Sequence, residues 1–593
     1  MKQFLITVAG VFVGLLLFAI LVPAALVGLA VAASRPAALP ARTVLALDLR
    51  NPLTDQEPQG GRALFAPAGQ SVIGIETALA RAAGDSQVGG LFVRLPDGGI
   101  SPAAADELRA AFLRFRAAGK PIVAVSQGLY PSGVVTSTYE LGAASGDLWM
   151  QPGASFQATG VALESVFLKR FFDKYGVQAD YQQRYEYKTA VNPYLYSDFT
   201  PAHRESELSW MGGVYDTAIA SVAADRKLAP ATVKALVEAG PYSAEDAKAK
   251  GLIDHVGEVK EAENAILREA GQGAKLAPFS TYAARGRASL GSAGAPAIAL
   301  IQAEGAIITG TSGSSSPFSG GGSIFSDDVA KAFETAAADK DVKAIVFRLS
   351  SPGGSDTASE QILAAIRAAK AAGKPVVVSM GTYGASGGYW VSSEASEIVA
   401  QPSTLTGSIG VFGGKFAVGD ALSRFGVDVR DLSVGGAYAD AFNPGAPMNQ
   451  AQQGAFKAWI DRIYNGFVSR VAQGRRIPVA RVGEIAKGRV WTGAQARGLG
   501  LVDNLGGLPQ AVERAKALAR ISGEARLKPI PVGAHPLAVL ARLLGGADAD
   551  SARLLTAADD VAGDPDARRL LEILHDARLR ASGAMVLAPR LVD

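Results

Sequence analysis

The chain has 593 residues, of which 48% are hydrophobic and 19% are charged, and its formal net charge is +3. This composition indicates a folded globular protein and excludes both a disordered chain and a strongly basic nucleic-acid-binding protein. The absence of cysteine excludes disulfides, thiolate nucleophiles and Cys-ligated metal sites. At roughly 150 residues per domain, the length predicts two to four structural units.

The N-terminus carries a long apolar segment. Residues 4–33 contain no charged side chain, and Thr7 is their single hydroxyl. A membrane-spanning helix needs about 20 apolar residues, whereas the apolar region of a cleaved signal peptide has about 7–15. The segment therefore predicts an uncleaved signal anchor, with an unusually long cleaved signal peptide as the alternative. Both predict that the body is exported, although the flanking charges fix no orientation.

The chain repeats itself at a spacing of about 250 residues. The run "VGGLFVRLPDGGIS" from Val88 matches "VKAIVFRLSSPGGS" from Val342, and "AGKPIVAVSQGLY" from Ala118 matches "AGKPVVVSMGTY" from Ala372. A third pair follows in the same order, which indicates two homologous halves in tandem. We therefore predict an anchor with its flank (1–42), a first half (43–268), a linker (269–295), a second half (296–525) and a C-terminal helical extension (526–593).

Each half alternates strand and helix patterns. Runs such as "VKAIVFRLS" and "KPVVVSM" are typical of buried parallel strands. Between them, "ASEQILAAIRAAKAAG" has apolar residues at helical spacing and ends at a glycine. Strand–helix–strand units of this kind predict an α/β fold with crossover helices. The run 311–323, rich in Gly and Ser, is predicted to be a flexible surface loop.

Two turns of the second half could carry chemistry. In "TYGASGGYW", Ser386 follows a strand pattern and precedes a helix pattern, so its hydroxyl could project as a nucleophile beside the N–H of Gly387. One strand earlier, "SPGGS" places Gly353 and Gly354 before a helix, which favours an oxyanion hole. The alternatives are a small-residue packing turn at Ser386 and an ordinary Pro-Gly turn.

The proton acceptor for Ser386 is not obvious, because the chain has four histidines and none lies near it in sequence. An α/β-hydrolase would place its histidine after the serine, where only His535 and His575 occur. Aligning the halves instead reveals a lysine, Lys188 in "YEYKTAVNPY", that faces Ala439 in the second half. Burial could lower the pKa of a lysine from about 10.4 far enough for it to act as a base. The alternative is a surface lysine.

Taken together, the run 373–414 and "SPGGS" at 351–355 closely resemble bacterial signal peptide peptidase A, or protease IV, in its long form with two tandem halves and an N-terminal anchor. The resemblance implies a Ser–Lys dyad in which Ser386 is the nucleophile and Lys188 the general base. Ser408, in "LTGSIG", matches the serine that orients the lysine. Gly354 and Gly387 match the oxyanion donors, and no metal or cofactor is implied.

The resemblance also implies an overall organisation. Each half would have the α/β fold of crotonases and Clp proteases, and the chain would form a homotetramer anchored in the bacterial inner membrane. A single span would leave the catalytic body in the periplasm, where the enzyme would degrade remnant signal peptides and other apolar peptides. Two rivals stay open: an α/β-hydrolase-type Ser–His esterase or peptidase, and a non-catalytic membrane scaffold.

Overall fold

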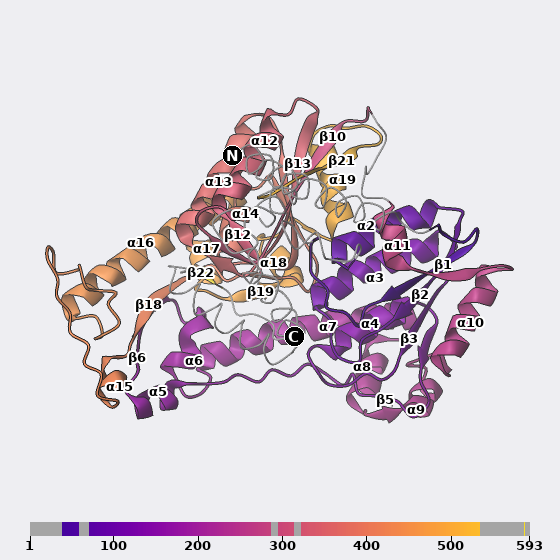
Figure 1. Cartoon of the computed structure of the whole chain (residues 1–593), viewed down its shortest axis with the longest axis horizontal. Helices are drawn as coiled ribbons and strands as arrows, with labels where there is room; N and C mark the ends of the chain where they lie inside the picture. Colours follow the sequence, from indigo (N-terminus) through magenta and orange to yellow (C-terminus); the bar gives the residue numbers. More distant parts are fainter. Residues whose placement is uncertain (1–37, 58–69, 286–293, 313–321, 534–585, 588–593) are drawn as a thin grey trace, which may run out of the picture.

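A computed structural model describes residues 38–57, 70–285, 294–312, 322–533 and 586–587 (Figure 1). The predicted signal anchor, most of the predicted loop at 311–323 and most of the C-terminal extension lie outside these residues. Within the described part of the chain, no helix is long and apolar enough to cross a membrane. The described residues form two α/β units, each built around a largely parallel sheet.

The first unit has a six-stranded sheet in the order β8-β4-β3-β2-β1-β9, in which every neighbouring pair is parallel. Helices α2, α3 and α4 pack on one face and α10 on the other. Two-sided coverage explains why the strands are apolar on both faces. The bounds are β1 Thr43–Asp48, β2 Val88–Arg94, β3 Ile122–Ser126, β4 Leu148–Met150, β8 His255–Val256, β9 Lys275–Pro278, α2 Val72–Gly84, α3 Pro102–Ala117, α4 Val135–Ala144 and α10 Val259–Ala270.

The second unit repeats this plan with an eight-stranded sheet whose main path is β19-β17-β15-β13-β10-β21, with β16 and β20 beside it. Helices α12, α13 and α14 cover one face and α19 the other. The strands are β10 Ala297–Glu304, β13 Val342–Ser351, β15 Val376–Ala385, β16 Glu397–Ala400, β17 Leu405–Gly407, β19 Val490–Thr492, β20 Asn504–Leu505 and β21 Arg526–Ile530. The helices are α12 Ser326–Ala338, α13 Asp356–Ala371, α14 Gly387–Ser392 and α19 Leu508–Leu518.

Each sheet extends past the boundary that the sequence pattern predicts for its half. Strand β9 lies inside the predicted linker 269–295, yet it pairs in parallel with β1. Strand β21 lies beyond residue 525, yet it pairs in parallel with β10. Both are edge strands with the sequences "KLAP" and "RLKPI", which contain proline and few β-branched residues. Such strands give a weak sequence signal, because proline is tolerated at an edge.

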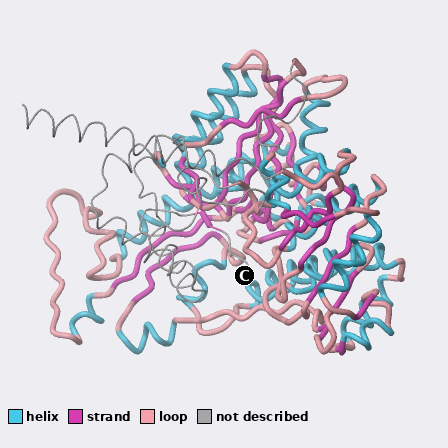
Figure 2. Tube along the Cα trace, turned by 45° about the vertical axis from the view of Figure 1, so that its right-hand side comes forward, coloured by secondary structure: helices cyan, strands magenta, loops and turns pink. Residues whose placement is uncertain are grey.

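The two units also exchange segments. Strand β6 (Gln178–Arg184) leaves the first unit and pairs antiparallel with β18 (Val411–Ala417) of the second. Figure 1 shows these strands in an arm, together with α5 (Lys169–Tyr175) and α15 (Gly419–Ser423). The long helix α7 (Pro201–Arg226) contacts α4 of the first unit and β19 of the second. In Figure 2 the two paired strands of the arm run side by side in magenta. The first unit therefore contributes residues to the surroundings of the second.

The remaining elements are short, apart from helix α16. A small sheet in the order β12-β11-β14-β22 lies beside the second sheet and contains the Gly353–Gly354 pair. The bounds are β5 Ser155–Phe156, β7 Tyr242–Ser243, β11 Ala306–Ile308, β12 Ser323–Phe325, β14 Gly353–Gly354, β22 Val586–Leu587, α6 Asn192–Leu195, α8 Pro230–Glu238, α9 Ala244–Ala249, α11 Phe279–Ala284, α16 Gln450–Arg475, α17 Val479–Ile485 and α18 Gly493–Gly498.

Candidate active site

Ser386 lies at a sharp turn between strand β15 and helix α14. Its backbone has φ 56° and ψ −117°, a conformation that residues with a side chain rarely adopt. The turn is held on both sides, because the Ser386 N–H donates to the Gly407 carbonyl (2.8 Å) and the Ser386 carbonyl accepts from Trp390 N–H (2.8 Å). These bonds stabilise a backbone that would otherwise cost about 1–3 kcal/mol. The turn fixes the hydroxyl at the start of a helix.

Lys188 reaches the second unit through the β6–β18 pair. It follows β6 and precedes a short 3₁₀ turn at Thr189–Val191. Its backbone packs so tightly against Gly488 that a Cβ on the glycine would lie 2.5 Å from Lys188 N. The side chain is 1% exposed, and this burial holds the pKa of the Lys188 ammonium well below its ordinary value. The alternative of a surface lysine is therefore wrong.

Lys188, Ser386 and Ser408 meet in one buried cluster. Lys188 Nζ lies 2.6 Å from Ser386 Oγ and 3.0 Å from Ser408 Oγ. It also donates to the Ser408 carbonyl at 3.1 Å. Ser408 follows β17 and has φ 49°, and its N–H donates to the Arg489 carbonyl at 2.7 Å. A neutral lysine in this position can accept the hydroxyl proton of Ser386 while Ser408 fixes its direction.

Gly354 and Gly387 lie next to each other at this cluster. A Cβ added to Gly387 would lie 2.8 Å from Ser359 Oγ and 3.0 Å from Gly354 N. A Cβ added to Gly354 would lie 2.0 Å from the Ile307 carbonyl of β11. Both positions therefore require glycine, and the two backbones approach to within contact distance. Adjacent backbone N–H groups beside a nucleophile are the arrangement that an oxyanion hole needs.

An extended segment of the chain itself lies along the Gly353–Gly354 strand. Strand β22 pairs antiparallel with β14, with Gly353 opposite Leu587 and Gly354 opposite Val586. The same strand also lies near β18, the strand that pairs with β6. The edge of β14 opposite β11 thus pairs with an extended backbone, in the mode known as β-strand addition.

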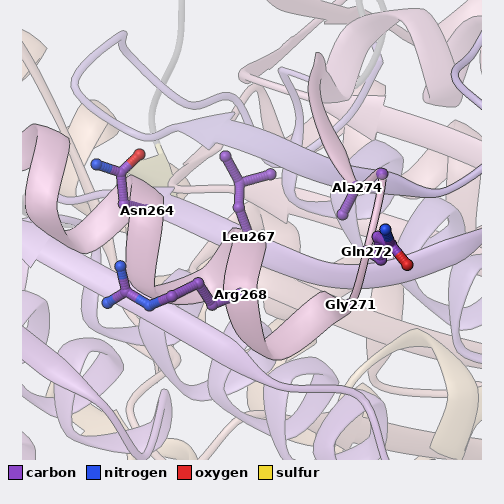
Figure 3. Close-up of a pocket in the computed structure, with 7 residues that line it drawn as sticks. Asn264, Leu267, Arg268, Gly271, Gln272 and Ala274 are labelled. Atoms are coloured by element: carbon purple, nitrogen blue, oxygen red, sulfur yellow. The ribbon is translucent and has the colours of Figure 1, made fainter.

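The described histidines take no part in this cluster. The side chain of His203 is buried with Nε2 3.5 Å from Glu207 Oε1, and His255 stacks on Trp149, both within the first unit. His535 and His575 lie outside the described residues. Figure 3 shows a surface hollow at the end of α10 that contains none of the cluster residues. It is lined by Asn264, Leu267, Arg268, Gly271, Gln272, Gly273 and Ala274.

Comparison with known proteins decides the family. Residues 114–273 and 368–522 match Peptidase family S49. Protease 4 of Salmonella typhi is 33% identical over 506 residues, which are 81% of this chain and 79% of that protein. The chain belongs to Peptidase family S49. It is therefore a serine peptidase, as the resemblance implies.

Other S49 relatives match over similar lengths. Protease 4 of Haemophilus influenzae is 30% identical over 466 residues, which are 76% of this chain and 73% of that protein. The chloroplastic serine protease SPPA of Arabidopsis thaliana is 28% identical over 485 residues, 81% of this chain and 69% of that protein. Matches of this length place the long, two-part organisation of the chain within Peptidase family S49.

The sequence did not point to two glycines that contact the backbones of Lys188 and Ser386. Gly488 packs on the Lys188 backbone, and Gly407 accepts from the Ser386 N–H. Both glycines have positive φ, at 86° and 74°. Each stands between non-glycine neighbours in "AKGRV" and "LTGSI", which marks a special backbone position but does not say what packs against it.

Proposed function

We propose that Ser386 is the nucleophile of this peptidase and that Lys188, supplied by the other unit, is its general base. The single observation that carries the proposal is the 2.6 Å contact between Lys188 Nζ and Ser386 Oγ, with both side chains buried. Burial lowers the pKa of Lys188, which favours the neutral amine that can take a proton. Ser408 orients Nζ through its hydroxyl and its carbonyl.

The reaction follows from these positions. Ser386 Oγ attacks a peptide carbonyl while Lys188 Nζ takes its proton, which forms a tetrahedral intermediate. The protonated Lys188 then gives the proton to the leaving amine, and the C–N bond breaks to leave an acyl-enzyme on Ser386. Water attacks the ester with Lys188 again as the base, and Oγ leaves with the proton.

We assign the backbone N–H groups of Gly354 and Gly387 as the donors that stabilise the oxyanion. The close approach of these two glycines supports the assignment. Donors held in a dry site need no reorganisation as charge develops, and losing one typically costs about 10²–10³ in rate.

The substrates we propose are cleaved signal peptides and other apolar peptides, bound as a strand on the edge of β14. The antiparallel pairing of β22 with β14 supports this binding mode, because it needs only a backbone that can extend. The sequence of β22, Val586–Leu587, is itself apolar. A peptide bound in this way would present successive carbonyls toward Ser386.

We further propose a single-span protein of the bacterial inner membrane, with its body in the periplasm and four copies assembled as a homotetramer. We also propose that both halves have the crotonase and Clp-protease fold. Exposed apolar side chains near the arm support assembly, since Phe425, Leu432 and Val434 are 80%, 100% and 99% exposed in the single chain.

The test is hydrolysis of a synthetic signal peptide by the protein lacking residues 1–37, with wild type compared with Lys188→Ala. The expected result is normal assembly with loss of turnover. If turnover survives, another base serves Ser386, and the Ser–His rival gains support.

A further inference from the structure

We propose that Asp55 and Glu107 of the first unit are positioning residues that hold Ser386 and the oxyanion glycines in register with Lys188. The proposal rests on the Ser–Lys assignment above and extends it to the contact between the two units. Neither residue touches the reacting atoms. Both act through the ends of strands β13 and β15, which carry Gly353–Gly354 and Ser386.

Arg348 is the centre of this contact. It lies in β13, and its guanidinium is fully buried. Nη1 and Nη2 donate to the two carboxylate oxygens of Glu107 at 3.2 and 2.8 Å. Nη1 also donates to Ser379 Oγ of β15 at 3.2 Å. Because a buried charge is costly unless it is paired, removing Glu107 would leave Arg348 without its closest partner.

Glu107 also contacts the second unit at another position, the start of helix α19. It lies on helix α3, and its Oε1 accepts from Leu508 N–H at 2.9 Å, at the start of α19. Gly507 makes room for it, because a Cβ there would lie 2.4 Å from Oε1. The neighbouring Asp106 accepts from Ser403 N–H at 2.8 Å. One turn of α3 therefore fixes three separate segments of the second unit.

Asp55 joins the two strands that lead into the active site. Its Oδ2 accepts from Ser350 Oγ on β13 and from Thr382 N–H on β15, the latter at 2.9 Å. Ser350 stands four residues before Gly354, and Thr382 stands four residues before Ser386. Asp55 Oδ1 also lies 3.8 Å from Arg348 Nη2. A single carboxylate of the first unit thus bridges the strands that deliver the oxyanion glycines and the nucleophile.

The first half provides an internal comparison. Arg94 of β2 occupies the place in the repeat that Arg348 occupies in the second half. It is partly exposed, and its Nη2 donates to Gln127 rather than to a carboxylate. Among the described residues, the half without the proposed nucleophile shows no such buried acidic contact at this position. This difference links the contact to the reaction, because β2 and β13 occupy equivalent central places in the two sheets.

The geometry explains why such a contact would matter to the rate. Ser386 and Lys188 come from different units, so their 2.6 Å contact depends on how the units dock. Reacting groups displaced by about 1 Å can cost about 10²-fold in rate. Asp55 and Glu107 connect the unit that carries Lys188 to the two strand ends that carry the other half of the site.

The test compares Glu107→Gln with a matched control, Asp225→Asn. The side chain of Asp225 is 5% exposed and pairs with Arg109 at 2.7 and 2.9 Å, but both residues lie within the first unit. Melting curves define a temperature at which each variant is folded, and hydrolysis of a signal peptide is then measured. We expect Glu107→Gln to lower kcat about 10- to 100-fold with little change in KM. The control should keep the wild-type kcat.

Asp55→Ala is the second variant, and it tests the proposal if Glu107→Gln does not fold. The same loss of kcat is expected, together with slower labelling of Ser386 by a fluorophosphonate. The proposal is overturned if the folded variants keep the wild-type kcat, or if the control loses as much. Lys188→Ala is measured alongside. Full activity in that variant would show that the Ser–Lys assignment itself is wrong, whatever Asp55 and Glu107 do.

Discussion

Lys188 Nζ lies 2.6 Å from Ser386 Oγ, although 198 residues separate the two along the chain. The two residues belong to different units, and β6 carries the lysine across to β18 of the second unit. The tandem halves have therefore not kept two equivalent sites. In the mechanism proposed above, one half supplies the base and the other supplies the nucleophile, so neither half would act alone.

The first prediction concerns Lys188→Met, which keeps the length of the side chain but removes the base. We expect peptide hydrolysis to fall by about 10²–10⁴-fold, the usual contribution of general acid–base catalysis. We also expect a higher melting temperature, because a buried lysine is costly and methionine fills the same space. Steady-state kinetics and calorimetry check both. Lys487→Met, on an exposed lysine nearby, is the control and should change neither.

The pH dependence follows from the lowered pKa of Lys188. The neutral lysine is the active form, so kcat/KM should rise with pH through the folded-state pKa, well below about 10.4. The free energy of unfolding should also rise with pH. Lys188 binds its proton more tightly in the unfolded chain than in the folded protein, so stability is lost as pH falls through the folded-state pKa. A pH–rate profile and unfolding at several pH values test this. Stability in Lys188→Met should depend less on pH.

Ser408→Ala removes one of the groups that hold Lys188 Nζ. The 3.0 Å contact to Ser408 Oγ is lost while the contact to the Ser408 carbonyl is retained. A hydrogen bond of this kind contributes about 1 kcal/mol, so we expect a loss of roughly 5- to 10-fold in kcat/KM. Peptide hydrolysis measures it. A loss as large as that of Lys188→Met would mean that Ser408 does more than orient the lysine.

Gly387→Ala tests the oxyanion site. The new Cβ would press on Ser359 Oγ and on Gly354 N, so the two backbones must separate. We expect kcat to fall by about 10²–10³-fold with KM little affected, which is the signature of a lost transition-state donor. Gly483→Ala, where a Cβ meets nothing within 4 Å, is the matched control. Equal activity in the two variants would contradict the assignment.

Truncation after residue 533 separates the Ser–Lys dyad from the Ser–His rival. The shortened chain lacks His535, His575 and β22 but keeps Ser386, Lys188 and Ser408. We expect kcat to be retained and KM to fall, because β22 no longer covers the edge of β14. Loss of all activity in a folded, truncated protein would instead support a histidine base.

The turn that carries Ser386 could be predicted from its local sequence, whereas the burial of Lys188 could not. Ser386 stands between a clear strand pattern and a clear helix pattern, so its turn was predictable. Lys188 stands among Tyr185 and Glu186, which are exposed, and its burial depends on Gly488 some 300 residues later. Only the comparison of the two halves and the family resemblance pointed to it.

The contact made by Asp55 and Glu107 shows the same limit. Glu107 lies on the buried face of α3 among alanines, which is a weak sign of a paired charge. Its partner Arg348 lies in β13, where the other residues from Ala344 to Leu349 are all apolar. Nothing local says that the two meet, because the pairing arises only when the units dock.

The most direct measurement is the site and rate of labelling by a fluorophosphonate, followed by mass spectrometry of the labelled peptide. The account predicts a single adduct on Ser386 in the wild type, with labelling of Lys188→Met slowed by at least about 10²-fold at neutral pH. An adduct on another residue, or equal labelling of Ser386 in the two proteins, would contradict the Ser386–Lys188 dyad.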